Sequence, residues 1–173
     1  RVYITTVTAQ WANICVCGPK AREVLASTGT NINLDANPFP FMAIREGQVA
    51  GKFSRVARVS YTGELSFEVN VRRRDGLAVW EALMDAGAAF GITPVGSETS
   101  GVLRIEKGYI SAGAEGDGIT NPFDAGMSWV VNMNKSDFVG KRSLVRDQSV
   151  GGLRQQVVGL LPQDEQFVMV EGS

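Results

Sequence analysis

The alternating segment SFEVNV, residues 66–71, follows the turn sequence SYTGE, residues 60–64, and together they restrict the folds open to this chain. Phe67, Val69 and Val71 are apolar, and the residues between them are polar. Successive side chains of a strand point to opposite faces of a sheet, so this pattern predicts a half-buried strand. The glycine-containing turn between this strand and the preceding segment VARV predicts a β-hairpin, and therefore antiparallel pairing.

Glu68 lies inside this predicted strand, on the face opposite Phe67 and Val69. Such a carboxylate is ordinarily solvated, and the pattern alone favours that interpretation. The alternative is that the face lines a ligand pocket. One carboxylate accepts two parallel donors from a heterocycle whose amino group lies next to a ring N–H. An aromatic ring near it, such as that of Tyr61, stacks on the same heterocycle.

The remaining sequence predicts a mixed order of strands and helices. A strand is expected at 11–17 and further strands around a Glu46–Gly47 turn. Further elements are predicted from periodicity, turn residues and proline positions: helices within 20–28, 75–91, 97–108 and 135–148, and strands at 127–133 and about 154–161. Regular βαβ alternation is missing, so the order predicts an α+β fold: a mixed, largely antiparallel sheet with helices packed on it.

The length of 173 residues suits one domain, or one domain and part of another. Gly151 and Gly152 interrupt the pattern, so we place a domain boundary there, with a first domain at 1–150 and the opening of a second at 151–173. The chain opens on Arg1 inside a segment that itself reads as a strand. We therefore expect it to be a piece of a longer protein.

Composition excludes several classes of function. Lysine and arginine total 17 against 18 acidic residues, so no basic surface for nucleic acid is expected. There is no apolar run long enough for a membrane-spanning helix. The chain has no histidine, which removes Ser-His-Asp and Cys-His catalysis and most zinc sites unless another chain supplies the residue.

The two cysteines, Cys15 and Cys17, share one face of the predicted strand at 11–17. We expect buried free thiols in a reducing, cytoplasmic compartment, and no metal site.

Three other motifs leave alternatives open. The glycine-rich loop 113–118 does not match a dinucleotide fingerprint. The charged run from Arg72 to Asp75 is either a solvated corner, which is favoured, or a patch for a polyanionic ligand tail or a partner subunit. Arg104 forms either a structural ion pair, which is favoured, or part of an active site.

Several segments together resemble a known family. They are ANICVCGPKAREVLA, SYTGELSFEV, LRIEKGYISAGAEGDGITNPFDAGMSWVV and NKSDFVGKRSL, in family order over about residues 8–161. The chain resembles the aminomethyltransferase family, which comprises the folate-binding T-protein of the glycine cleavage system and its relatives. Its motifs are most similar to those of the sarcosine oxidase alpha branch. The resemblance implies the second half of a T-protein-type domain, with the N-terminal half missing, and a truncated C-terminal β-barrel from residue 151.

The resemblance also implies site residues. Tyr61, Glu68 and Tyr109 match family positions that line the folate site. No catalytic residue is implied within the chain, because the family aspartate lies upstream of Arg1. Ser100 and Gly101 stand where the T-protein pattern has Arg-Asp, which leaves open whether the truncated domain still binds folate.

The implied function is that of a fragment of a folate-dependent amine-demethylating enzyme, which would form 5,10-methylenetetrahydrofolate on tetrahydrofolate. FAD or FMN and NAD are expected only in the rest of the parent, with further subunits of a hetero-oligomeric oxidase as partners and neither nucleic acid nor membrane. The isolated fragment is expected to be inactive. The alternatives are a glycine cleavage T-protein fragment and a non-catalytic interaction module. The amine substrate and the oligomeric state stay open.

Overall fold

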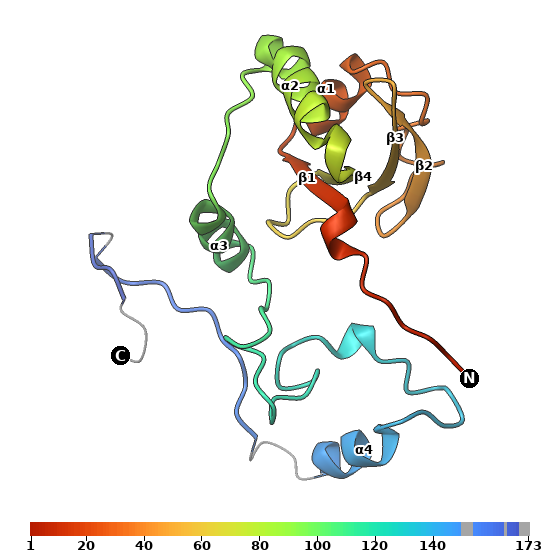
Figure 1. Cartoon of the computed structure of the whole chain (residues 1–173). Coiled ribbons are helices and arrows are strands. Elements are labelled where there is room, and N and C mark those ends of the chain that lie inside the picture. The colour runs from red at the N-terminus through yellow and green to blue at the C-terminus, as the bar shows by residue number, and fades with distance from the viewer. Residues whose placement is uncertain (150–153, 165, 170–173) are drawn as a thin grey trace. The chain divides into compact units, whose positions relative to one another are not determined.

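The computed structural model describes residues 1–149, 154–164 and 166–169, and the chain divides into two compact units, Arg1–Tyr109 and Ile110–Ser173 (Figure 1). The glycine pair on which the predicted boundary at 150–151 rests lies outside the described residues. That boundary therefore stays a prediction. Within the described residues, no helix combines the length and the apolar character needed to cross a membrane.

The first unit is an α+β fold built on a four-stranded sheet in the order β1-β4-β3-β2, with every neighbouring pair antiparallel. This confirms the predicted fold class and the hairpin that joins β3 to β4. The elements of the unit are η1 (Thr8–Gln10), β1 (Trp11–Cys17), α1 (Ala21–Ser27), β2 (Ile44–Val49), β3 (Lys52–Ala57), β4 (Ser66–Arg72), η2 (Arg73–Asp75), α2 (Gly76–Gly87), η3 (Ala88–Phe90) and α3 (Ser97–Glu106).

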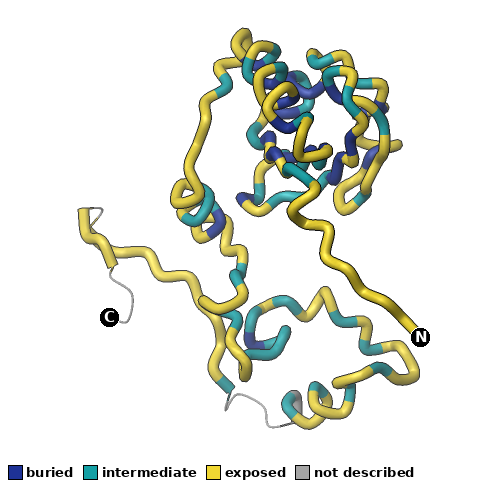
Figure 2. Tube along the Cα trace, viewed as in Figure 1, coloured by how far each residue is buried: buried dark blue, intermediate teal, exposed yellow. Residues whose placement is uncertain are grey.

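The hydrophobic core lies between the sheet and helices α1 and α2, where Figure 2 shows the buried residues gathered. Phe67, Val69 and Val71 of β4 are all fully buried, as the alternation predicts. Val79 and Leu83 of α2 meet them from the helix side, one turn apart on the same helix face. The period of two in the strand and the period of about four in the helix therefore direct the apolar side chains of both elements into one core.

The opposite, open face of the sheet carries the alternate residues of each strand. On the two strands that matter for the site these are Trp11, Asn13, Cys15 and Cys17 of β1, and Ser66, Glu68, Asn70 and Arg72 of β4. Cys15 is exposed and Cys17 is half-buried, so the prediction of buried thiols was wrong. The pleat of the strand explains this difference, because it directs both thiols to the face of the sheet that lies away from the helices.

The β2–β3 turn is formed by Ala50 and Gly51, with φ angles of 49° and 70°. The predicted turn at Glu46–Gly47 was wrong, since both residues lie inside β2. Gly47 is needed there for close packing. A Cβ at Gly47 would lie 2.5 Å from Cγ1 of Ile32.

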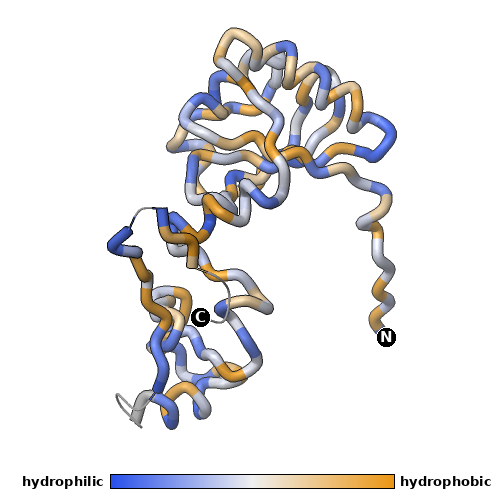
Figure 3. The backbone as a smooth tube through the Cα atoms, turned by 90° about the vertical axis from the view of Figure 1, so that its left-hand side faces the viewer, coloured by the Kyte–Doolittle hydropathy of each residue, from blue (hydrophilic) through white to orange (hydrophobic). Residues whose placement is uncertain are grey.

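Residues 1–7, expected to continue a strand, have no regular secondary structure. Their apolar side chains are exposed, with Val2 at 87% and Ile4 at 92%, and alternate with more polar residues along the segment (Figure 3).

The second unit contains little regular structure. Its helices among the described residues are η4 (Ser128–Val130) and α4 (Lys141–Ser149), and α4 confirms the helix predicted within 135–148. The strand predicted at 127–133 was wrong, because η4 occupies its middle. Residues 154–161 form no strand. Asp124 is the only buried residue among those of this unit whose burial is described, so no apolar core directs these segments into a sheet.

Candidate functional site

The carboxylate of Glu68 lies at the centre of the open face. Strand β4 is flanked by β1 and β3, and Glu68 pairs across them with Cys15 and Ala57. Its side chain is half-buried, and its Oε2 accepts a hydrogen bond of 3.1 Å from Nδ2 of Asn13. The same amide donates to Oδ1 of Asn70 at 3.0 Å. The carboxylate is therefore held through one oxygen while its other oxygen accepts no hydrogen bond within the described chain.

Tyr61 lies in the loop 58–65 that leads into β4. Its ring is 48% exposed. The neighbouring Ser60 places its hydroxyl oxygen in a buried position with no hydrogen-bond partner among the described residues. A polar ligand atom that reaches this loop would satisfy that hydroxyl, and such a requirement is typical of a binding site.

Tyr109 follows the C-terminal end of α3, and Arg104 fixes its backbone. Nη1 of Arg104 donates to the Tyr109 carbonyl oxygen at 2.9 Å, and the Tyr109 N–H donates to the Arg104 carbonyl at 2.8 Å. Arg104 is buried, and the Tyr109 ring is 38% exposed. Arg104 thus positions the chain that carries the tyrosine, and the ion pair expected for it stays a prediction.

A close contact joins the end of α3 to the Tyr61 loop. Gly63 has a φ of 80°, and a Cβ at this position would lie 2.1 Å from Cγ of Lys107. The lysine side chain therefore packs directly over the glycine, which brings the segment before Tyr109 onto the loop that carries Tyr61. No hydrogen bond or ring contact joins the three side chains of Tyr61, Glu68 and Tyr109 to one another in this fully described part of the chain.

The thiols border the same face. Sγ of Cys15 lies 3.3 Å from Oγ of Ser66. Burial, together with the neighbouring Cys15, raises the pKa of the Cys17 thiol, so Cys17 is protonated and weakly nucleophilic at neutral pH. No group of three or more metal-ligating side chains gathers within the described residues.

A basic corner ends the same face. A hollow of about 320 Å³ is lined by Gln10, Trp11, Arg72, Arg73 and Arg74. The guanidinium of Arg55 lies 4.8 Å from the centre of the Trp11 ring, and its Nε forms an ion pair of 2.8 Å with Oε1 of Glu46. Sequence reasoning singled out the arginine run but not Trp11 or Arg55, because their proximity depends on the strand order.

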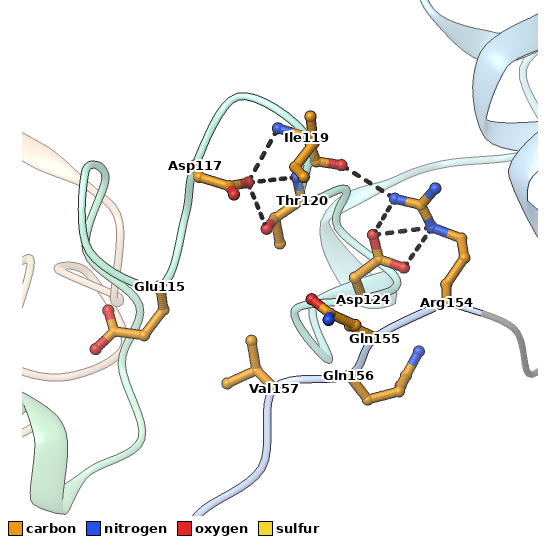
Figure 4. Close-up of a pocket in the computed structure, with 9 residues that line it drawn as sticks. All are labelled: Glu115, Asp117, Ile119, Thr120, Asp124, Arg154, Gln155, Gln156 and Val157. Carbon is orange, nitrogen blue, oxygen red and sulfur yellow. Dashed lines mark hydrogen bonds and ion pairs between the residues drawn. The ribbon is translucent and has the colours of Figure 1, made fainter. Parts of the chain in front are cut away.

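A second hollow, of about 550 Å³, lies within the second unit (Figure 4). Asp124 is buried there, and its two carboxylate oxygens accept hydrogen bonds of 2.8 and 3.0 Å from Nε of Arg154. The hydrogen bonds from Arg154, supported by the Asn121 N–H, lower the pKa of Asp124 to about 2. Sequence reasoning missed this pair, and no local signal marks it, because thirty positions separate the two residues.

Asp117, at the rim of this hollow, is also engaged in local hydrogen bonds, all of them through Oδ1. The hydrogen bond from the Thr120 hydroxyl, followed by those from the backbone N–H groups of Ile119 and Thr120, lowers the pKa of Asp117. The acidic groups here close turns and an ion pair, so this hollow has a structural explanation and the open face of β4 is the better candidate site.

Residues 1–135 match the family model described as the GCVT N-terminal domain, and the chain belongs to this family.

The curated relatives show which proteins carry this domain. The chain is 43% identical over 173 residues to the sarcosine oxidase subunit alpha of Corynebacterium sp. (strain U-96), a match covering 99% of this chain and 18% of the relative. It is 38% identical to the aminomethyltransferase of Chloroherpeton thalassium, over 84% of this chain and 39% of that protein. It is 35% identical to human mitochondrial dimethylglycine dehydrogenase, over 95% of this chain and 19% of that protein. The chain thus spans from under a fifth to two fifths of these relatives.

Proposed function

We propose that this chain is part of the folate-binding portion of an amine-demethylating enzyme of the sarcosine oxidase type. The family match supports this, and so do relatives named as a sarcosine oxidase subunit, an aminomethyltransferase and a dimethylglycine dehydrogenase. The single observation that carries the proposal is the placement of Glu68 on the open face of a central strand, with Asn13 holding one carboxylate oxygen.

The residues present fit a reduced pterin. Its amino group and adjacent ring N–H offer two parallel donors, and one ionised carboxylate accepts both. Among the described residues no group donates a hydrogen bond to the second oxygen of Glu68, and the half-exposed ring of Tyr61 is available for stacking. Tyr109 would complete the site from the end of α3, with its backbone fixed by Arg104.

The role of the chain in this proposal is positioning. When bound, tetrahydrofolate would supply the nucleophilic nitrogens that take the one-carbon unit from an imine formed by amine oxidation, and the products would be 5,10-methylenetetrahydrofolate and the demethylated amine. Glu68 would fix the pterin against rotation, and the two tyrosines would limit its tilt, so that the reacting partners meet in one orientation. Flavin and NAD would be held by other parts of the enzyme, together with its further subunits. No catalytic group is assigned to the chain, and the isolated chain is expected to be inactive.

A calorimetric titration of a stable reduced folate into the whole enzyme that contains this chain tests the proposal. We expect Glu68→Gln to weaken binding by about tenfold or more, since a hydrogen-bonded charge is lost. Glu81→Gln, at an exposed position on α2, is the matched control and should bind as the unaltered enzyme does.

Two outcomes would overturn this assignment. Equal binding by the Glu68→Gln variant and the unaltered enzyme would place the pterin elsewhere. Absence of folate binding in both would favour the interaction module, the alternative that Ser100 and Gly101 bring forward. These two residues lie in α3 and supply neither a cation nor a carboxylate.

A further inference from the structure

The corner where β4 ends concentrates positive charge, which Asp75 offsets only in part within the described residues. Arg72, Arg73 and Arg74 are exposed and consecutive. Within the described residues, the side chains of Arg72 and Arg73 form no hydrogen bond or ion pair, and Arg74 approaches Asp75 only at 3.9 Å. The whole chain has a net charge of −1, so this density of charge is local. Three adjacent cations repel one another unless an anion lies between them.

The corner and the candidate pterin site share one face and one strand. Glu68, Asn70 and Arg72 alternate with the buried residues of β4 and therefore point to the same side. Four residues of extended chain separate Glu68 from Arg72 by about 13 Å. Arg72 pairs with Trp11 across the strands, and these two residues line the hollow at the corner. A ligand anchored at Glu68 and extended along β4 reaches that hollow.

We propose that the hollow lined by Trp11 and Arg72–Arg74 binds the carboxylate tail of the pterin ligand, namely the glutamate that ends a folate and any further γ-linked glutamates. This inference rests on the proposed function and extends it along the strand. The aromatic and amide bridge of the folate lies over Asn70, and the tail carboxylates meet the guanidinium groups at the end of the strand.

The chemistry of the corner favours a small polycarboxylate over a larger anionic partner. Guanidinium groups bind carboxylates through paired N–H donors. The strength of each such contact does not require a folate tail of one fixed length. A hollow of about 320 Å³ has the size of a small-molecule subsite. Trp11 offers an aromatic wall, held in place by the guanidinium of Arg55.

The test uses three ligands on the whole enzyme: a reduced pterin without a tail, tetrahydrofolate with one glutamate, and tetrahydrofolate with several γ-linked glutamates. Affinity should rise with the number of glutamates, and added salt should reduce that gain. Arg72→Gln and Arg73→Gln should each weaken binding of the polyglutamyl ligand by about twofold to fivefold. Both variants should leave the tail-less pterin unaffected. Arg142→Gln, an exposed arginine of α4, is the control and should change neither ligand.

The outcomes separate the two proposals. If binding of the tail-less pterin depends on Glu68 but tail length has no effect, the tail subsite is wrong and the proposed function stands. Equal losses for all three ligands in Arg72→Gln would also overturn the subsite, because the arginine would then act on the pterin or on the fold. Failure of every pterin to bind, or binding indifferent to Glu68, would overturn the proposed function itself.

Discussion

At the scale of single residues, the amide of Asn13 decides how the Glu68 carboxylate is presented. Asn13 pairs directly with Asn70 and reaches Glu68 diagonally, so one amide bridges two polar side chains of β4. A glutamate with three rotatable side-chain bonds loses conformational freedom when it binds a ligand. The hydrogen bond from Asn13 removes part of that freedom beforehand, which is the physical meaning of preorganisation.

Removal of this amide should therefore weaken pterin binding without removal of the carboxylate. We expect Asn13→Ala to weaken binding of a tail-less reduced pterin by about threefold to tenfold, the net effect of one ordinary hydrogen bond, because the carboxylate itself remains and only its preorganisation is lost. Calorimetry on the whole enzyme measures it. Asn70→Ala is the matched control, because it shares the face but does not donate to the Glu68 carboxylate, and it should change binding of this ligand far less. Equal effects of the two variants would show that the face, and not the Asn13–Glu68 bond, is responsible.

The alternation of SFEVNV is enough to predict which side of β4 carries Glu68. The partnership with Asn13 could not be predicted in the same way. It arises because β1, 55 residues away, pairs with β4 in one register, and no local pattern encodes which strands become neighbours.

At the scale of elements, turns show why local sequence rules succeed or fail. The pair Glu46–Gly47 resembles a turn in sequence, yet it lies within β2, where the missing side chain of Gly47 allows close packing against Ile32. The true turn, Ala50–Gly51, needs positive φ at both residues, and the rule for such hairpins favours asparagine where this chain has alanine. A glycine required by packing and a glycine required by the turn look alike until the neighbouring segment is placed.

The contact between the Tyr61 loop and the end of α3 gives a prediction at this scale. Gly63→Ala should lower the free energy of unfolding by about 1 to 3 kcal/mol, because the new methyl group meets both an unfavourable φ and the Lys107 side chain. Gly51→Ala is the control, with a φ of 70° and open space around the new atom, and should cost only the backbone strain of about 1 kcal/mol.

Denaturant unfolding of both variants measures the difference. Lys107→Ala added to Gly63→Ala should bring its loss of stability close to that of Gly51→Ala. If the double variant is no more stable than Gly63→Ala alone, the lysine does not press on the loop and α3 is not held there by this contact.

At the scale of the whole molecule, the two units are stabilised differently. The first has a continuous apolar core between sheet and helices. In the second, among residues 110–149, 154–164 and 166–169, the one residue described as buried is the charged Asp124. Arg154 binds that carboxylate and also donates to the Ile119 carbonyl, and the Val157 N–H donates to the Asp124 carbonyl. The segment from 154 to 157 is therefore fastened to the loop 119–124 by polar contacts.

This organisation explains why sequence reasoning was weaker here. A sheet or helix that packs on a core leaves a period of two or 3.6 in the sequence, whereas an ion pair between distant loops leaves none. The strands expected at 127–133 and 154–161 were inferred from apolar runs, but no core exists in the described part of this unit to receive them. Whether residues from 151 belong to a separate domain stays a prediction.

The last prediction follows from the pKa of Asp124. The hydrogen bonds from Arg154 lower this pKa from 3.8 to about 2, so the folded unit binds the proton more weakly than the unfolded chain. The stabilisation is therefore fully present above about pH 4 and is lost as the pH falls through 4 towards 2. Asp124→Asn should abolish this part of the acid dependence and loosen the unit already at neutral pH.

Limited proteolysis within 110–149 of the whole enzyme, followed from pH 6 to pH 3 with an acid-active protease, measures this acid dependence. Asp137→Asn, an exposed aspartate of the same unit, is the control. Equal acid sensitivity of Asp124→Asn and the unaltered enzyme would mean that other carboxylates set the stability of this unit.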